Sequence, residues 1–311
     1  NYNLEDQPGY HAILTFDNYG VIQIDSTNYN GLYNSNYRGD TLSFNNYGNI
    51  SINHSLEDGN YNYNYVSVID SPFYYYGTSV MNINNFGTMN IDNSTEYGMF
   101  NYDDRGEELY FTNYGNLNIA TTGIHGIYNR CRPNGDYYTP SLTFDNIEGT
   151  INISATTLDG IYNYAQNDTI YYRNNGTLML NDIGQNGIYN YTTGVGASAD
   201  FYNNATLTLT NIAQNGIYNY SNNDSTYSKF YNGTNGDITI SNTMLDGIYN
   251  RTYSGGNTVA NKLLFVNDGI ISVSEAGERG IDNHAYRTYD FVFNNNGTLN
   301  LSNNTLEALH N

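Results

Sequence analysis

The sequence has little of several residues on which other protein classes depend. It contains no tryptophan, one cysteine and four prolines, and its only lysines are Lys229 and Lys262. A single cysteine excludes an internal disulfide framework, and no run of about eighteen apolar residues predicts a membrane-spanning helix. Zinc-ligand spacings, phosphate-binding loops and Ser-His-Asp arrangements are also missing, so we expect no enzymatic activity.

Positive charge is scarce as well. Lys and Arg total 10 against 30 Asp and Glu, which gives a formal net charge of -20 at pH 7. A field of this sign disfavours nucleic acid and anionic membrane surfaces as partners. The acidic residues are scattered along the chain, and this distribution predicts a solvated exterior.

Tyrosine and glycine are abundant, with 35 and 31 residues, and they recur in a tandem repeat. Each unit opens with an apolar residue, continues with Asn two places later, and ends in a four-residue element of the form GIYN. The base period is 28 to 29 residues, and longer units carry insertions. The openers are Phe16, Phe44, Ile83, Phe111, Phe144, Tyr172, Phe201, Phe230, Phe265 and Phe293.

Each unit contains three short segments in which apolar and polar residues alternate, as half-buried strands do. The segments are too short and too rich in Gly, Asn and β-branched residues for helices. We therefore predict an all-β fold, a parallel β-helix (β-solenoid) of about ten coils of 28 to 29 residues with three short strands per coil. Residues 1–311 are expected to form one solenoid, as a segment or processed subunit of a longer repeat protein.

Two Asn columns accompany the repeat. A stack of amides at coil spacing can hydrogen-bond along its own column, and Asn also tolerates the left-handed conformation that a corner needs. We interpret the first column as a structural ladder, and a second column closes the GIYN element from Asn34 to Asn283. The first column comprises Asn18, Asn46, Asn85, Asn113, Asn146, Asn174, Asn203, Asn232, Asn267 and Asn295.

The GIYN element is interpreted as a corner followed by a strand. Its Gly often follows Asn or Asp, a pair that makes tight turns at no steric cost. Its aromatic residue should point outward and form a ladder along the rod, which is the predicted contact surface. That ladder comprises Tyr33, Tyr61, Phe100, Tyr128, Tyr162, Tyr189, Tyr218 and Tyr249.

The longest insertions fall between GIYN and the next opener, at 63–82, 130–143 and 251–264, so we expect them at one edge of the rod. The first is aromatic and includes Tyr74, Tyr75 and Tyr76. Tyr side chains suit recognition surfaces because they are large, stiff and amphipathic. These loops are therefore either further contacts or segments packed onto the rod.

The remaining reactive residues give weaker signals. The five histidines fall at unrelated phases of the repeat and are expected to be exposed. We expect Cys131 to lie in a loop. Asp103, Asp104, Glu107 and Glu108 form the densest acidic cluster, interpreted as a charged loop, with Ca²⁺ binding as a minor hypothesis. Glycan cleavage would need two carboxyls about 5 to 10 Å apart.

The repeated block, as in NYGVIQI, NNGTLML and NDGIISV, resembles the β-helix repeats of filamentous-haemagglutinin-type adhesins and autotransporter passengers. It is also similar to the repeats of large secreted bacterial surface proteins. The resemblance implies an extracellular or cell-surface location, in bacteria, and an adhesive or fibrous role.

We therefore expect a structural or adhesive rod that forms or decorates a surface filament or adhesin. Its expected partners are further copies of itself and cell-surface glycans, without membrane insertion. The alternative is a glycan-binding or glycan-cleaving β-helix of the tailspike or lyase kind. Ice or mineral binding by a flat Thr array is a third hypothesis. It is disfavoured because Thr is not columnar in the sequence, apart from short runs such as residues 206–210.

Overall fold

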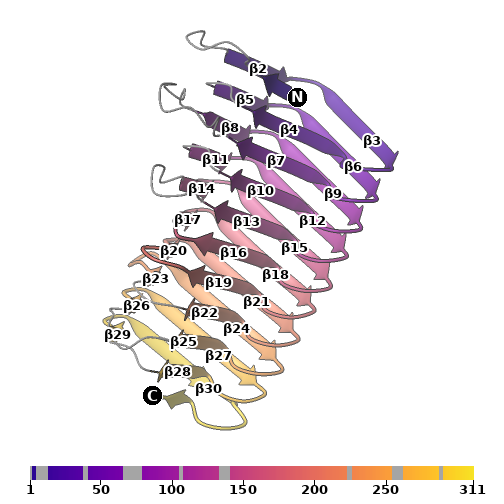
Figure 1. Ribbon diagram of the computed structural model, residues 1–311. Coiled ribbons are helices and arrows are strands. Elements are labelled where there is room, and N and C mark those ends of the chain that lie inside the picture. Colours follow the sequence, from indigo (N-terminus) through magenta and orange to yellow (C-terminus); the bar gives the residue numbers. More distant parts are fainter. Residues whose placement is uncertain are drawn as a thin grey trace, which may run out of the picture.

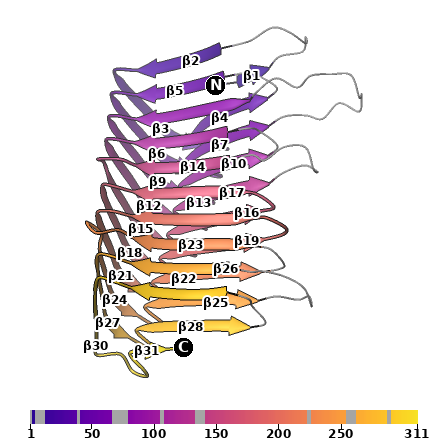
Figure 2. The same ribbon diagram turned by 90° about the vertical axis from the view of Figure 1, so that its left-hand side faces the viewer.

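The computed structural model describes residues 2–4, 13–37, 41–65, 79–104, 108–132, 141–222, 226–253, 262–286 and 290–311. It confirms the predicted parallel β-solenoid with three strands per coil. Each strand pairs in parallel with its copy in the next coil, and the pairs build three sheets that run the length of the rod (Figures 1 and 2). The described ranges contain no helix that could cross a membrane.

The sheets are named here A, B and C. Sheet A contains β1 (Tyr2–Leu4), β4 (Leu32–Tyr37), β7 (Asn60–Tyr65), β10 (Met99–Asp104), β13 (Ile127–Arg132), β16 (Ile161–Gln166), β19 (Ile188–Thr193), β22 (Ile217–Asn222), β25 (Ile248–Tyr253), β28 (Ile281–Tyr286) and β31 (Leu309–His310). Sheet B contains β2 (Ile13–Asn18), β5 (Thr41–Asn46), β8 (Val80–Asn85), β11 (Glu108–Asn113), β14 (Ser141–Asn146), β17 (Thr169–Asn174), β20 (Ser198–Asn203), β23 (Tyr227–Asn232), β26 (Lys262–Asn267) and β29 (Asp290–Asn295). Sheet C contains β3 (Val21–Thr27), β6 (Asn49–Ser55), β9 (Thr88–Ser94), β12 (Asn116–Thr122), β15 (Thr150–Thr156), β18 (Thr177–Ile183), β21 (Thr206–Ile212), β24 (Asp237–Thr243), β27 (Ile270–Ala276) and β30 (Thr298–Ser302).

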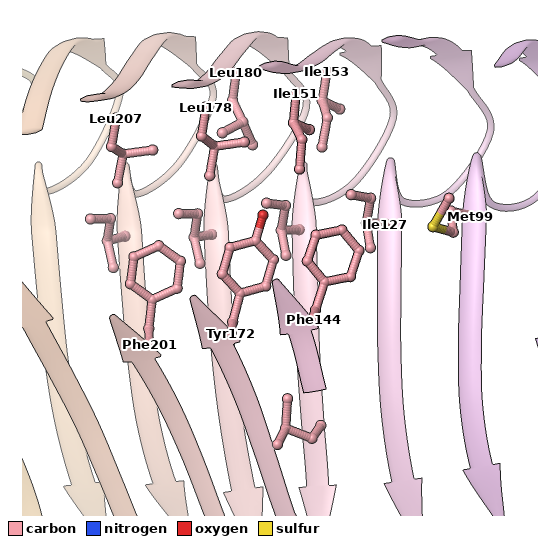
Figure 3. Packing of buried hydrophobic residues seen from close by; sticks show 14 of the residues in the cluster. Met99, Ile127, Phe144, Ile151, Ile153, Tyr172, Leu178, Leu180, Phe201 and Leu207 are labelled. Carbon is pink, nitrogen blue, oxygen red and sulfur yellow. The ribbon is translucent and has the colours of Figure 1, made fainter. Parts of the chain in front are cut away.

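The core lies inside the tube and consists of columns of like residues. In β15, Ile151 and Ile153 point inward and are fully buried, while Thr150 and Asn152 point outward. On sheet B the inward aromatic rings stack from Phe111 to Phe293 with centroids 4.6 to 5.1 Å apart. Figure 3 shows part of this stack facing the aliphatic columns of the other sheets. Because each residue packs on its own copy, a sequence of low mean hydropathy still buries a continuous core.

Both Asn columns form continuous ladders of buried amides, which confirms the first as the predicted structural ladder. In each step Nδ2 of one Asn donates to Oδ1 of the Asn in the next coil. The first ladder, on sheet B, has nine such bonds of 2.7 to 2.9 Å from Asn18 to Asn295. The second, on sheet A, has nine of 2.6 to 2.8 Å from Asn34 to Asn311.

The left-handed residue of each coil is not the ladder Asn, so that part of the interpretation was wrong. It lies near the end of every sheet C strand, where the chain bends and one residue drops out of the pairing. Solvent-facing side chains of several types occupy this column, from Ser26 and Thr121 to Ala155 and Glu275. Because the residue type varies from coil to coil, the sequence shows no pattern that predicts the left-handed position. The column comprises Ser26, His54, Asn93, Thr121, Ala155, Asp182, Asn211, Asn242, Glu275 and Asn303.

GIYN requires glycine for a reason other than the predicted tight turn. Among the described glycines only Gly194 and Gly196 have positive φ. At Gly126 a Cβ atom would lie 2.7 Å from the carbonyl oxygen of Gly160 and 2.4 Å from Ile153 Cγ2. The position requires glycine because the next coil leaves no space for a side chain.

Each predicted insertion begins in a sheet A strand and ends in the following sheet B strand, and the residues between them, 66–78, 133–140 and 254–261, lie outside the described residues. Their predicted bounds were too wide, because 63–65 and 80–82 belong to β7 and β8, and the ends of 130–143 and 251–264 likewise belong to strands.

Cys131 is in β13 and fully buried rather than in a loop. The Thr residues are more columnar than expected, since Thr150, Thr177 and Thr206 align on sheet C.

Tyr172 is the one tyrosine in the inward ring stack from Phe111 to Phe293, and its buried hydroxyl has no hydrogen-bond partner. A buried unpaired hydroxyl costs about 1 to 3 kcal/mol. We therefore predict that Tyr172→Phe raises the free energy of unfolding by about 1 kcal/mol or more, measured by urea denaturation. The neighbouring Tyr171 points outward, so Tyr171→Phe is the matched control and should change stability little. Loss of stability in Tyr172→Phe would contradict the account.

Candidate functional site

The outward side chains of sheet A form a surface that we call the tyrosine face. Strand alternation places Ile and Asn of the GIYN element inward and its aromatic residue outward, as predicted. A second column lies two residues farther along each strand and points the same way. It comprises Tyr63, Tyr102, Arg130, Tyr164, Tyr191, Tyr220 and Arg251.

The rings of the first column stack on one another along the rod. From Phe100 to Tyr249 successive centroids are 4.7 to 5.0 Å apart, with interplanar angles of 4 to 18°. Tyr33 and Tyr61 also stack, at 5.2 Å, whereas Tyr61 meets Phe100 edge to face. In the second column, Tyr164, Tyr191 and Tyr220 are 5.3 to 5.4 Å apart. The face is therefore a rigid ridge of rings with their edges toward solvent.

Stacking leaves these rings less exposed than a freely projecting ladder would be. Tyr33 is 40% exposed, but Tyr128 only 9%, and the others lie between. Burial raises the pKa of the phenols from Tyr128 to Tyr249 in this column, for example that of Tyr218 to about 12. These phenols are therefore neutral and present hydroxyl donors at physiological pH.

Arginines are interleaved with the tyrosines. The Arg130 guanidinium lies 4.8 Å from the ring centroid of Tyr102 and 5.7 Å from that of Tyr164, and that of Arg251 lies 5.2 Å from Tyr220. Such cation–π contacts keep the column continuous. From β7 to β25 the outward positions hold three arginines, the third being Arg132, and one acid, Asp104. The tyrosine face is thus locally positive on a strongly acidic chain.

The second column was not predicted, although the sequence carries its signal. Tyr follows GIYN or its variants directly at Tyr63, Tyr102, Tyr164, Tyr191 and Tyr220, which is the position with the same parity in the strand. Tyr74, Tyr75 and Tyr76 lie outside the described residues. The contact role of all these residues stays a prediction.

A polar column at the corner between sheets C and A lies beside the tyrosine face, at the residue before each GIYN glycine. Its Asn, Asp and His side chains accept hydrogen bonds from backbone N–H groups of the next coil. Asp58 Oδ1 accepts from Tyr97 N at 3.2 Å, and Asn215 Oδ1 accepts from Asp246 N at 3.2 Å. The predicted tight-turn residues therefore connect successive coils.

His125 belongs to this corner column and is buried, contrary to the expectation of an exposed histidine. Its Nδ1 accepts from the backbone N–H of Asp159 at 3.1 Å, and its ring stacks on Tyr97. Burial lowers the pKa of His125 to about 4. A neutral imidazole that serves as a backbone acceptor has a structural role here.

The acidic cluster does not converge on one point in the described part of the chain. Asp103 points into the tube and Asp104 points outward from the same strand, while Glu107 lies outside the described residues. Neighbouring strand residues face opposite sides, so Asp103 and Asp104 do not form a joint Ca²⁺ site. Among the described residues no group of three or more His, Cys, Asp or Glu could hold a metal ion.

The buried carboxyls of the corner column lie in separate coils, and other buried carboxyls such as Asp103 and Asp168 lie outside this column. Burial raises the pKa of Asp58 to about 7 and that of Asp159 and Asp246 to about 6. Asp58 and Asp159 are three coils apart, as are Asp159 and Asp246, so each distance is about 14 Å. This separation exceeds the roughly 5 to 10 Å of glycosidase carboxyl pairs.

Comparison of the chain with protein-family models, with curated proteins and with solved structures finds no match. The fold and the geometry of its faces therefore carry the functional argument.

The raised pKa of Asp58 predicts a pH-dependent stability. The folded chain binds this proton more tightly than the unfolded chain, whose carboxyl titrates near pH 3.9, so stability falls as the pH rises from about 4 to about 7. Asn occupies the same corner position in other coils, so Asp58→Asn fits. We predict that this change stabilises the chain more at pH 8 than at pH 5, by at least about 1 kcal/mol, measured by urea denaturation.

The exposed Asp92 provides the control, because Asp92→Asn removes the same charge without touching a buried group. His125 acts in the opposite direction between about pH 4 and 6.5, but it contributes equally to both proteins. An equal pH response of Asp58→Asn and Asp92→Asn would contradict the assignment.

Proposed function

We propose that this chain is a non-catalytic rod that forms or decorates an extracellular filament or adhesin at a bacterial cell surface, and that the tyrosine face is its contact surface. The observation that carries the proposal is the double column of outward rings, held in fixed register over the sheet A strands. Stiff aromatic side chains lose little conformational entropy on contact, and Tyr and Arg dominate protein interfaces.

The charge distribution also favours this face for self-association. Two copies with a net charge of -20 each repel one another unless the contact surfaces carry few acids. The tyrosine face has one acid and three arginines between β7 and β25. It therefore suits contact with an acidic surface, including another face of a second copy.

The same arginines favour one second candidate, which is binding of an acidic saccharide by this face. Guanidinium groups pair bidentately with carboxylate or phosphate groups, and the neighbouring phenols supply further donors. The two candidates differ in what they predict for the isolated chain, because only the first requires association of the protein with itself.

The triple substitution Tyr189→Ser, Tyr218→Ser and Tyr249→Ser tests the proposal. We predict that it leaves the coil folded, because the inward Ile and Asn columns remain, but weakens association at least tenfold in Kd. Sedimentation and electron microscopy would measure the assembly, and circular dichroism the fold.

The matched control removes three tyrosines from another surface. Tyr19, Tyr47 and Tyr114 belong, with Phe86, to an exposed stack of rings 4.8 to 4.9 Å apart at the corner between sheets B and C. Their replacement by Ser should leave association intact. Equal effects of both triple variants would overturn the assignment to the tyrosine face, and a monomeric chain that binds acidic saccharides through this face would favour the second candidate.

A further inference from the structure

The outer face of sheet C differs from the rest of the molecule because it is almost free of charge. Before the left-handed residue, ten strands with three outward positions each give thirty side chains, and only Asp25, Asp92 and Asp237 among them are charged. The left-handed column along one edge of this face adds two carboxylates, Asp182 and Glu275. Among these thirty, the four adjacent strands β12, β15, β18 and β21 contribute twelve side chains without any charge, and the only carboxylate in their left-handed column is Asp182. Most of the thirty are short Thr, Ser and Asn side chains.

The amides on this face are already hydrogen-bonded along the rod. Asn118 Nδ2 donates to Asn90 Oδ1, and Asn152 Nδ2 donates to Asn118 Oδ1, both at 2.8 Å. Near the edge of the face, Asn211 Nδ2 donates to Asn181 Oδ1 at 3.2 Å. A polar group that has a partner within its own chain costs less to remove from water than an unpaired group.

Short side chains in register on a parallel sheet are the surface that packs dry against a second sheet, as in steric zippers with amide ladders. The described face measures about 20 Å by about 45 Å, or roughly 900 Å². This area exceeds the approximately 800 Å² per partner of a standard interface. Aliphatic side chains such as Met179 and Ile270, which are 40% and 44% exposed, would supply apolar contact.

We propose that the outer face of sheet C packs against the same face of a second copy of this chain. Charge selects this occupant, because two copies of an acidic chain approach each other most easily where charge is scarce. If a two-fold axis parallel to the rod relates the two chains, each coil faces the same coil of the second copy. The middle outward residue of a strand then lies opposite the same residue of the partner strand. Asp92 then faces Thr88 and Asp237 faces Ser241, so no carboxylate faces another.

This interface goes beyond the proposed function, because it lies on a different sheet from the tyrosine face. A rod with contact surfaces on sheets A and C can join neighbours on two sides, which is what lateral growth of an assembly requires. The two interfaces are separable by substitutions confined to one sheet.

Thr208 is the middle outward residue of β21, and Thr208→Glu places two carboxylates opposite each other in the proposed dimer. We predict at least a tenfold increase in the dimer Kd, measured by analytical ultracentrifugation at physiological salt. The control is Ser43→Glu on the outer face of sheet B, which makes the same change in net charge and should leave the Kd unchanged. The Tyr189, Tyr218 and Tyr249 triple variant should retain this dimer.

A covalent readout accompanies this measurement. Met179→Cys places two thiols opposite each other across a sheet spacing of about 10 Å, so a thiol-specific bifunctional reagent of similar length should yield a cross-linked dimer, whereas Ser43→Cys should not. Cys131 is fully buried and does not compete. The proposal is overturned if the wild-type chain stays monomeric, including a monomer that binds ice through this face, or if Thr208→Glu and Ser43→Glu act alike.

Discussion

Every side chain in this solenoid must be compatible with its own copy in the next coil, about 4.8 Å away. Asn meets this constraint by donating and accepting in one column, and aromatic rings meet it by stacking. Glycine meets it where the next coil leaves no space for a Cβ atom, as at Gly126. The repeat in the sequence is therefore a direct consequence of this spacing, and the amide ladders are its most complete expression because they run through all ten coils on sheets A and B.

The same constraint gives each sheet a chemistry of its own. A residue type that tolerates stacking is repeated from coil to coil, so outward positions become uniform stripes. Sheet A presents stacked tyrosines with interleaved arginines, sheet C presents short uncharged side chains, and sheet B carries ions of both signs, such as Asp145 and Arg173, which pair at 2.6 Å. A rod of this kind offers extended surfaces rather than a pocket, and this is why its functional interpretation rests on contact with other surfaces.

Much of the fold could be predicted from the sequence because the constraint acts on residues that can be read directly. The period, the three strands per coil and the first Asn column follow from it. The corners were predicted less well. The left-handed column contains residues as different as Ser26, Thr121 and Ala155, so no repeated residue type in the sequence indicates it. The second tyrosine column was visible only after the strand parity was fixed. The scarcity of charge on the outer face of sheet C appears only when residues 27 to 39 positions apart are placed side by side. A stripe specifies chemistry and geometry rather than one ligand, which is why the sequence predicts contact surfaces and no particular partner.

The central claim is that amide bonds between successive coils hold this register, and a double-mutant cycle on the sheet A ladder tests it most directly. Asn163 Nδ2 donates to Asn190 Oδ1 at 2.8 Å, whereas Asn250 is three coils from Asn163. The account predicts that Asn163→Leu and Asn190→Leu together cost less than the sum of their single effects, with a coupling energy of about 1 to 3 kcal/mol. Asn163→Leu and Asn250→Leu should be additive. Additive effects for the adjacent pair would contradict the claim that the ladder holds the coils in register.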